Sequence, residues 1–345
     1  MSRANERFLP TGKLRPEFLA GLLELFGCGD SAVVQGSAVG VDVAILDLGG
    51  PQLLAAKTDP ITFATDAIGY YAVVVNSNDI ATCGGRPRWM LTTALLPEKA
   101  ANEDLAADIF HQLADACDRF DITHVGGHTE VTYGLDRPIL VATMLGLVDR
   151  GRYITSAGAR AGDVILLTKA VAVEGTSLLA RELGQTLLDR GFDETFVARC
   201  AAMLYEPGIS VLREAQVAVE TGKDSVHAMH DPTEGGLTMG LWELALAARK
   251  RVFVDVARIP VLEECRRLCD VFGLDPLGLI ASGSLLITVA PEVAGRVAKA
   301  IEDAEVPCAP IGEVQEGPAE ALAQTADGEL VPLPRYDQDE LTKVL

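Results

Sequence analysis

The sequence predicts a mixed α/β protein of two domains. Its 345 residues exceed what one compact core usually holds, so two domains of about 150 residues each are expected. Hydrophobic residues make up 49% of the chain and charged residues 23%, a composition typical of globular proteins rather than of disordered or fibrous ones. Stretches that alternate apolar and polar residues are interspersed with stretches of helical periodicity, so each half is expected to combine strands and helices.

The first half predicts the element order ββαβαββ after an N-terminal arm. The expected elements are a helix from Pro16 to the glycines at 27 and 29, a β-hairpin over 41–59 turning at Gly49-Gly50, a helix over 67–83, a strand over 89–97, a helix over 102–119, and strands over 122–125 and 138–148, with a glycine loop between the last two. Asn102 is a suitable N-cap for its helix, with acidic residues in the first turn. This order predicts helices on one face of a mostly antiparallel sheet. The other face stays open and is expected to pair with a second copy of the chain.

The second half begins after a polar, glycine-rich segment at 150–163 and again predicts a mixed α/β layer. The expected elements are a strand over 163–169, helices over 174–220, a strand over 226–230, a helix from 235, strands over 252–256 and 284–290, a helix over 291–304, and strands over 309–314 and 328–333. The predicted division is an arm and first helix at 1–30, an N-terminal domain at 31–152, a C-terminal domain at 153–334 and an acidic tail at 335–345.

Charge and cysteine content narrow the class of partner. The chain has 29 basic and 49 acidic residues, and a formal charge of −20 disfavours nucleic acid and anionic membranes as partners. An anionic ligand would therefore need local backbone amides or bound cations. The seven cysteines form no CxxC pair, which favours buried thiols in a reducing compartment. With no apolar run long enough to span a bilayer and no signal-peptide core, we expect a cytoplasmic protein.

Five short segments combine acidic or amide side chains with small neighbours. They are GVDVAIL around Asp42, KTDPIT around Asp59, NSNDIATCGGRP around Asn78 and Asp79, GGHTEV at 126–131, and HDPTEGGL at 230–237. Oxygen ligands of this kind suit magnesium bound to nucleotide phosphates. An isolated Asp42 or Asp231 would more often be a turn or cap residue. Asp79 differs, because it interrupts an apolar helix, and a buried carboxylate is costly unless it is paired or bound to metal.

The common catalytic and nucleotide motifs are absent. The sequence has no G-x4-G-K-[ST] loop, no GxGxxG after a strand and no GxSxG elbow, and its five histidines have no metal-ligand spacing.

The ordered set of segments nevertheless resembles a known family. GVDVAIL, KTDPIT, NDIATCGGRP, GGHTEV, AGDVILLTK, VEGTSLLA, HDPTEGGL, DPLGLIASGSLLITV and IGEV follow one another as in the aminoimidazole-ribonucleotide synthetase (PurM-like) superfamily, over about residues 11–334. Within it the chain is most similar to the HypE hydrogenase-maturation group. The resemblance implies ATP and Mg²⁺ as cofactors, and a homodimer whose N-terminal sheets form a central β-barrel.

The resemblance also implies roles for individual residues. Catalytic roles would go to Asp79, Asp231 and Lys13, the last in an arm that closes over the triphosphate. Phosphate and nucleotide contacts would come from Asn78, Gly126, Gly127, Thr129, Thr233, Gly235 and Gly236. Metal ligands would be Asp42, Asp59, Asp79, Asp231, His128 and Glu130. The helix from Leu237 would point its positive end at the nucleotide.

Three positions depart from the HypE pattern. HypE proteins carry the carbamoyl group on a terminal cysteine, whereas this sequence has no cysteine after Cys308, so that step is not expected to run in the same way. His128 stands where the group usually has the aspartate of GGDT, with Glu130 nearby as a substitute. Glu234 replaces the arginine of DPTRGG, and a positive phosphate partner is lost.

Three functions remain open from the sequence. The first is an ATP-dependent enzyme that activates an amide, carboxylate or similar oxygen of a small molecule, with a maturation-type protein partner as a further possibility. The second is a small-molecule kinase resembling thiamine-phosphate kinase. The third is a nucleotide-binding scaffold that has lost catalysis, suggested by His128 and Glu234.

Overall fold

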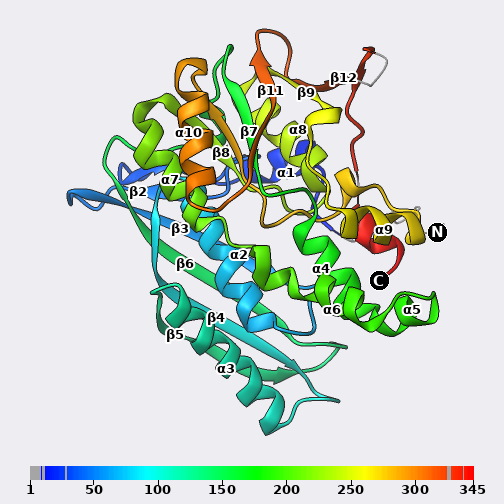
Figure 1. Cartoon of the computed structure of the whole chain (residues 1–345). Helices are drawn as coiled ribbons and strands as arrows, with labels where there is room; N and C mark the ends of the chain where they lie inside the picture. The colour runs from blue at the N-terminus through cyan, green and yellow to red at the C-terminus, as the bar shows by residue number, and fades with distance from the viewer. Residues whose placement is uncertain (1–8, 10–11, 28, 325–327, 337) are drawn as a thin grey trace, which may run out of the picture.

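The computed structural model describes residues 9, 12–27, 29–324, 328–336 and 338–345. It contains two β-sheets, one from each half of the chain, with helices packed against both (Figure 1). The predicted mixed α/β class is therefore confirmed. No helix in the described residues is long and apolar enough to cross a membrane.

The first sheet has six strands in the order β1-β2-β3-β6-β4-β5. Its strands are β1 (Val33–Gln35), β2 (Ala44–Leu46), β3 (Gln52–Ile61), β4 (Arg86–Pro97), β5 (Thr123–Thr132) and β6 (Ile139–Asp149). Neighbouring strands are antiparallel except β4 and β5, which run parallel. The accompanying helices are α1 (Pro16–Leu23), α2 (Ile68–Thr82) and α3 (Glu103–Arg119). The predicted hairpin corresponds to β2 and β3, and the predicted side-chain cap of Asn102 accepts a hydrogen bond from Leu105 N at 2.8 Å.

Helix α2 is the element that joins the two halves. Every one of its residues is buried, since it packs against β3, β6 and α3. It also contacts helix α7 (Leu212–Gly222) and strand β8 (Val226–His230) of the second half. Its close approach to α3 depends on Gly69, where a Cβ would lie 2.7 Å from Leu113 N. Polar side chains of α2 are therefore held inside the protein rather than on its surface.

The sheet face opposite α2 carries apolar side chains that are only partly covered. Along β6, Leu140, Ala142 and Met144 are buried beneath the helices, while Val141 and Leu145 alternate with them and stay partly exposed. On the edge strand β5, Val125 and Val131 are 51% and 59% exposed. An exposed apolar surface of this kind is typical of an association face.

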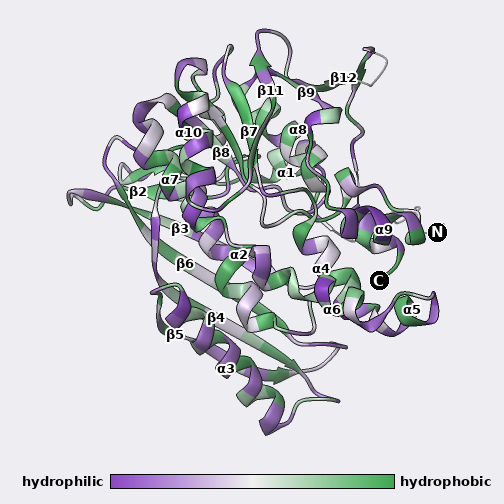
Figure 2. Cartoon of the chain, in the orientation of Figure 1, coloured by the Kyte–Doolittle hydropathy of each residue, from purple (hydrophilic) through white to green (hydrophobic). Residues whose placement is uncertain are grey.

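The second sheet has seven strands in the order β13-β12-β9-β11-β7-β10-β8. Its strands are β7 (Val164–Thr168), β8 (Val226–His230), β9 (Arg251–Asp255), β10 (Leu286–Val289), β11 (Cys308–Gln315), β12 (Glu320–Gln324) and β13 (Leu330–Pro332). The helices are α4 (Val173–Glu182), α5 (Gly184–Asp189), α6 (Glu194–Ala202), α7 (Leu212–Gly222), α8 (Gly236–Ala248), α9 (Glu263–Phe272) and α10 (Pro291–Asp303). Helix α8 covers one face of this sheet, and α7 and α10 cover the other. In Figure 2 strand β7 is hydrophobic, and the exposed sides of α3 and α10 are hydrophilic.

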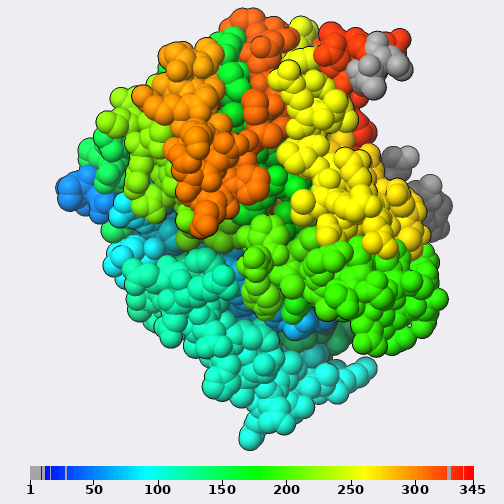
Figure 3. All heavy atoms as spheres, viewed as in Figure 1, coloured from blue at the N-terminus to red at the C-terminus, as the bar shows by residue number. Residues whose placement is uncertain are grey.

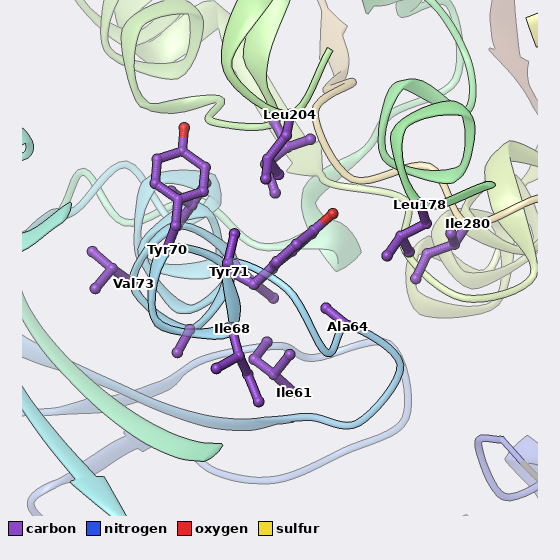
Figure 4. Packing of buried hydrophobic residues seen from close by; sticks show 14 of the residues in the cluster. Ile61, Ala64, Ile68, Tyr70, Tyr71, Val73, Leu178, Leu204 and Ile280 are labelled. Carbon is purple, nitrogen blue, oxygen red and sulfur yellow. The ribbon is translucent and has the colours of Figure 1, made fainter. Parts of the chain in front are cut away.

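The two halves share part of one hydrophobic core. Residues of α4, α6, α9 and the short 204–208 segment cluster with those of α2, including Leu178, Leu204 and Tyr71 (Figure 4). In the space-filling view the α4–α6 region lies directly against the first-half residues (Figure 3). A packed core thus holds the two halves together.

Most predicted elements are found, with local differences. The predicted glycine loop after residue 125 is wrong, because strand β5 continues through Gly126 and Gly127. This is possible because Gly127 has φ +158° and a Cβ there would lie 1.9 Å from Thr92 O. The segment 174–220 divides into α4, α5, α6 and α7, and β12 was not predicted.

Candidate metal centre

Four of the predicted acidic residues meet in one cleft between the two halves. Asp42 precedes β2, Asp59 lies on β3, Asp79 on α2 and Asp231 directly after β8, and all four line a cavity of ≈ 340 Å³. Thr233, Glu234 and Lys13 line it as well. We refer to this acidic group and its basic neighbours as the metal centre.

Asp231 is the residue whose environment most clearly indicates a bound ligand. Its side chain is 3% exposed, and neither carboxylate oxygen has a hydrogen-bond partner in the described part of the chain. Burial, with the nearby charge of Asp42, raises the pKa of Asp231 to about 7. Buried carboxylates without partners are costly, and a divalent cation is a partner that removes the cost. Ligand atoms of Asp42, His230 and Asp231 lie within 4.8 Å of one another, so the carboxylates of Asp42 and Asp231 are close enough to share one cation.

His230 binds the carboxylates on either side of it. Its Nδ1 lies 3.1 Å from Asp42 Oδ2 and its Nε2 lies 2.8 Å from Glu243 Oε2. Burial alone would lower the pKa of His230, but the two carboxylates raise it well above its ordinary value. The charged ring donates from both nitrogens, so it orients Asp42 rather than offering a free lone pair to a metal.

Lys57 lies between two of the predicted carboxylates. Its Nζ is 3.5 Å from Asp59 Oδ2 and 3.4 Å from Asp79 Oδ2. Asp79 is 4% exposed, and burial raises its pKa well above the ordinary range although Lys57 opposes the shift. The ammonium therefore supplies positive charge where the sequence predicted only anionic ligands.

The N-terminal arm reaches the HDPTEGGL segment. Lys13 Nζ donates to Thr233 Oγ1 at 2.8 Å and lies 3.9 Å from Glu243 Oε1. The expected arm lysine is thus at the cleft, beside a predicted phosphate-binding hydroxyl.

The glycine pair of HDPTEGGL is required by backbone geometry. Gly235 and Gly236 have φ +78° and +68°, and a Cβ on Gly236 would lie 2.4 Å from Leu277 O. Their amides already have partners, since Gly235 N donates to Asp339 Oδ2 at 2.7 Å and Gly236 N donates to Thr233 O at 3.0 Å. A phosphate could reach them only by displacing these acceptors.

Asn78 does not line the cleft, so that expectation is corrected. Its Nδ2 donates to Ile209 O at 2.8 Å and its Oδ1 accepts from Val211 N at 2.9 Å. Asn78 directly precedes Asp79 on α2 and faces a different side of the helix, where its amide holds the segment before α7.

The GGHTE residues do not reach the metal centre of their own chain. Gly126, Gly127, His128, Thr129 and Glu130 lie on edge strand β5, and β6 and β4 separate this strand from β3, which carries Asp59. His128 Nε2 instead lies 3.2 Å from Glu130 Oε2 on the surface. The expected cofactor and metal contacts of these five residues are therefore not made within one chain.

Four residues of the site were not predicted from the sequence: Lys57, His230, Glu243 and Asp339. Lys57 could have been found, because it lies two residues before Asp59 on a strand and so faces the same side. Glu243 could have been found from its place two helical turns after Gly236 in α8. No local sequence pattern could have identified Asp339, because its contact with Gly235 joins residues that are 104 positions apart.

Comparison with known proteins gives matches over most of the chain. Residues 40–148 match the family of the AIR synthase related protein, N-terminal domain, and residues 160–323 match its C-terminal domain. A putative hydrogenase expression/formation protein of Methanocaldococcus jannaschii is 30% identical over 239 residues, or 69% of this chain and 66% of that protein, slightly under two thirds of its length. The selenide, water dikinase of Nitratidesulfovibrio vulgaris is 31% identical over 288 residues, covering 79% of this chain and 75% of that enzyme.

Among solved structures, the hydrogenase maturation protein HypE in complex with ATP superposes with a TM-score of 0.72 at 25% identity. The superposition covers 96% of this chain and 98% of that one.

Proposed function

The chain belongs to the AIR synthase-related, PurM-like family, and on this premise we propose that it is an ATP-dependent enzyme that transfers the terminal phosphoryl group to an oxygen of a small molecule, with Mg²⁺ as cofactor. The observation that carries the proposal is Asp231, a buried carboxylate with two unpartnered oxygens in a cleft of acidic residues. The HypE structure with ATP supports ATP as the nucleotide.

The charge of the cleft explains why metal and nucleotide would bind together. Eight carboxyl groups and four basic side chains line the cavity among the described residues. A nucleotide triphosphate would be repelled by this excess unless divalent cations bound as well. Asp42, Asp59, Asp79 and Asp231 are the residues that would hold magnesium. When bound, the ion would neutralise charge on the phosphates.

The chain's own cations would complete the phosphate site. Lys13 and Lys57 would balance the triphosphate from two sides, and the Thr233 hydroxyl that now accepts from Lys13 would be free to donate to phosphate. The protein's main task would be to align an oxygen nucleophile with the terminal phosphate and keep water out. Glu234 would face this region without the positive charge of an arginine. Lys13 and Lys57 would therefore be the side chains that neutralise the phosphate charge.

We further propose that the enzyme acts as a homodimer. The partly exposed apolar face of the first sheet and the exposed edge strand β5 support pairing of two such sheets. Pairing would carry β5 of a second copy, with its Gly126–Glu130 segment, towards the metal centre that the same segment does not reach in its own chain. A protein partner in a maturation pathway and a cytoplasmic location also remain proposals.

The second candidate function is a small-molecule kinase, for which the phosphorylated molecule is the final product rather than an activated intermediate. The similarity to selenide, water dikinase extends over more of the chain than the similarity to the hydrogenase expression/formation protein, which favours a small-molecule kinase. The two candidates differ in product: a kinase releases a stable phosphorylated compound, whereas an activating enzyme releases free phosphate.

Calorimetric titration of ATP, with and without Mg²⁺, tests the proposal. We expect wild-type binding that requires Mg²⁺, and affinities weakened about tenfold or more in Asp231→Asn and Asp79→Asn. Asp224→Asn, an exposed carboxylate just before β8, is the matched control and should bind like wild type. Wild-type protein that fails to bind Mg²⁺-ATP would contradict the proposal, whereas binding without turnover would favour a nucleotide-binding scaffold.

A further inference from the structure

A second cavity of ≈ 630 Å³ adjoins the metal centre, and we call it the acceptor pocket. It is formed by the end of β3, the turn after it, α2, the 134–139 turn, the start of α4 and the 280–282 segment. Lys13, Asp59, Thr233 and Glu234 line both this pocket and the metal centre. A molecule in the acceptor pocket would therefore lie next to the terminal phosphate of a nucleotide bound at the metal centre.

Two residues that line this pocket each hold a buried polar atom without a hydrogen-bond partner in the described residues. These atoms are Glu174 Oε2 and Tyr71 Oη, on side chains that are 5% and 1% exposed. The Tyr71 hydroxyl points from α2 towards Leu178 of α4 and Ile280, away from Ile61 (Figure 4). Nearly all buried polar atoms in proteins are paired, so two unpaired atoms on residues that line one cavity indicate a ligand-binding position.

The backbone holds Glu174 firmly at this position. Glu174 N donates to Ser282 O at 3.3 Å and Gly175 N donates to Ile280 O at 3.1 Å, which joins the first turn of α4 to the 280–282 segment. Gly175 permits this contact, because a Cβ there would lie 2.4 Å from Leu279 Cγ. A carboxylate in the first turn also benefits from the helix dipole, but that benefit does not require an unpaired oxygen. Rigid support of this kind is typical of a preorganised binding group.

The excess of acidic side chains in the pocket disfavours anionic ligands. Asp59, Asp136, Glu174 and Glu234 line it, against Lys13 and Arg137. Both unpaired atoms can accept a hydrogen bond, and Phe63 and Tyr71 offer aromatic surface, to which cations are attracted. Burial raises the pKa of Glu174 to about 7, and a bound cation would bring it back towards the ordinary value.

We propose that the acceptor pocket binds a substrate through a protonated nitrogen, an ammonium or amidinium group, whose N–H groups donate to Glu174 Oε2 and Tyr71 Oη. This inference rests on the proposed function for the identity of the pocket as the acceptor site, because the nucleotide would occupy the neighbouring cleft. It makes Glu174 and Tyr71 specificity-determining residues for the molecule that receives the phosphoryl group.

Three probes of the same shape and different charge test the inference. Benzamidine is cationic, benzamide neutral and benzoate anionic, and each is titrated into the full chain at pH 8 by ligand-observed NMR. We expect benzamidine to bind, benzamide to bind more weakly and benzoate not to bind. Glu174→Gln should weaken benzamidine about tenfold or more and Tyr71→Phe by a smaller factor. Glu103→Gln, an exposed glutamate in the first turn of α3, should leave benzamidine binding unchanged.

The outcomes separate this inference from the proposed function. Benzamidine binding that is equal in wild type and Glu174→Gln, equal affinity for benzamide and benzamidine, or no binding of benzamidine would each overturn it. Titration of Mg²⁺-ATP into the same samples reports on the metal centre alone. Binding of Mg²⁺-ATP without binding of benzamidine would contradict the pocket inference only. Binding of benzamidine without binding of Mg²⁺-ATP would contradict the proposed function but leave the cation-binding pocket supported. Thermal unfolding midpoints of the variants establish that they fold.

Discussion

Two groups of buried charge in the second half of the chain differ in how completely they are paired. Lys169, at the end of β7, donates through Nζ to Glu214 Oε1 at 2.6 Å, to Ser210 O at 2.6 Å and to Gly283 O at 2.9 Å. Asp231, at the end of β8, has no hydrogen bond to either oxygen from the described residues. Both sit at strand ends and both are buried, so position and burial do not distinguish them.

The difference lies in what each group needs from outside the chain. The Lys169 cluster satisfies its own charges and binds β7 to α7, so it is explained by the fold alone. The buried, unpartnered carboxylate of Asp231 destabilises the folded state. A residue of that kind is retained where a bound ligand offsets the destabilisation. Pairing of buried charge thus separates structural residues from candidate functional ones.

Removing the lysine of the paired group should have the largest effect on stability. Lys169→Met leaves Glu214 buried without its cation, and we expect a loss of about 3–5 kcal/mol in the free energy of unfolding. Urea denaturation measures this loss. Lys250→Met, which removes an exposed pair with Glu316, is the control and should cost less than about 1 kcal/mol. Equal losses in the two variants would contradict the comparison.

Magnesium should stabilise the protein through the unpaired group. At a Mg²⁺ concentration 100 times its Kd, binding to the folded state alone adds about 2.7 kcal/mol to the free energy of unfolding. Asp231→Asn should abolish most of this gain, and Lys169→Met should retain it. Thermal unfolding with Mg²⁺ and with EDTA provides the measurement. A gain that survives in Asp231→Asn would place the ion elsewhere.

The pH dependence of stability should also distinguish Asp231. Its pKa of about 7 in the folded state lies above the unfolded value near 4, so the folded state holds the proton more tightly. Metal-free wild type should therefore lose stability as pH rises from about 4 to 7, by up to about 4 kcal/mol from this group. Asp231→Asn cannot lose that proton, and its unfolding midpoint should fall less between pH 5 and pH 8. Identical pH profiles would show that Asp231 is not desolvated.

Asp339 sharpens the comparison, because it is a paired carboxylate inside the candidate site. It accepts from the amides of Gly235, Ile280 and Leu341 at 2.7, 3.2 and 2.8 Å. It should therefore behave like the paired group, and Asp339→Asn should cost about 1 kcal/mol because an amide group has only one acceptor oxygen. Chemical denaturation of the metal-free protein would detect this loss. A gain in stability, as expected for Asp231→Asn at pH 8, would mean that pairing does not predict the role.

The sequence by itself determined the class of fold and four of the acidic residues that line the candidate site. Alternation and helical periodicity are local properties, so β2, β3, α2 and α8 could be located from them. Asp42, Asp59, Asp79 and Asp231 could be selected because each follows or interrupts an apolar element beside small residues, where burial of a carboxylate is costly. The resemblance to the family rested on the same segments.

Only the tertiary structure decided which of these segments meet. Asn78 and Asp79 are adjacent in sequence, but one turns to the segment before α7 and the other to the cleft, because neighbours on a helix point about 100° apart. The GGHTE residues lie three strands from Asp59, since strand order depends on pairing between distant parts of the chain. The acceptor pocket and the contact between Asp339 and Gly235 likewise come from packing between segments far apart in sequence, which no local pattern records.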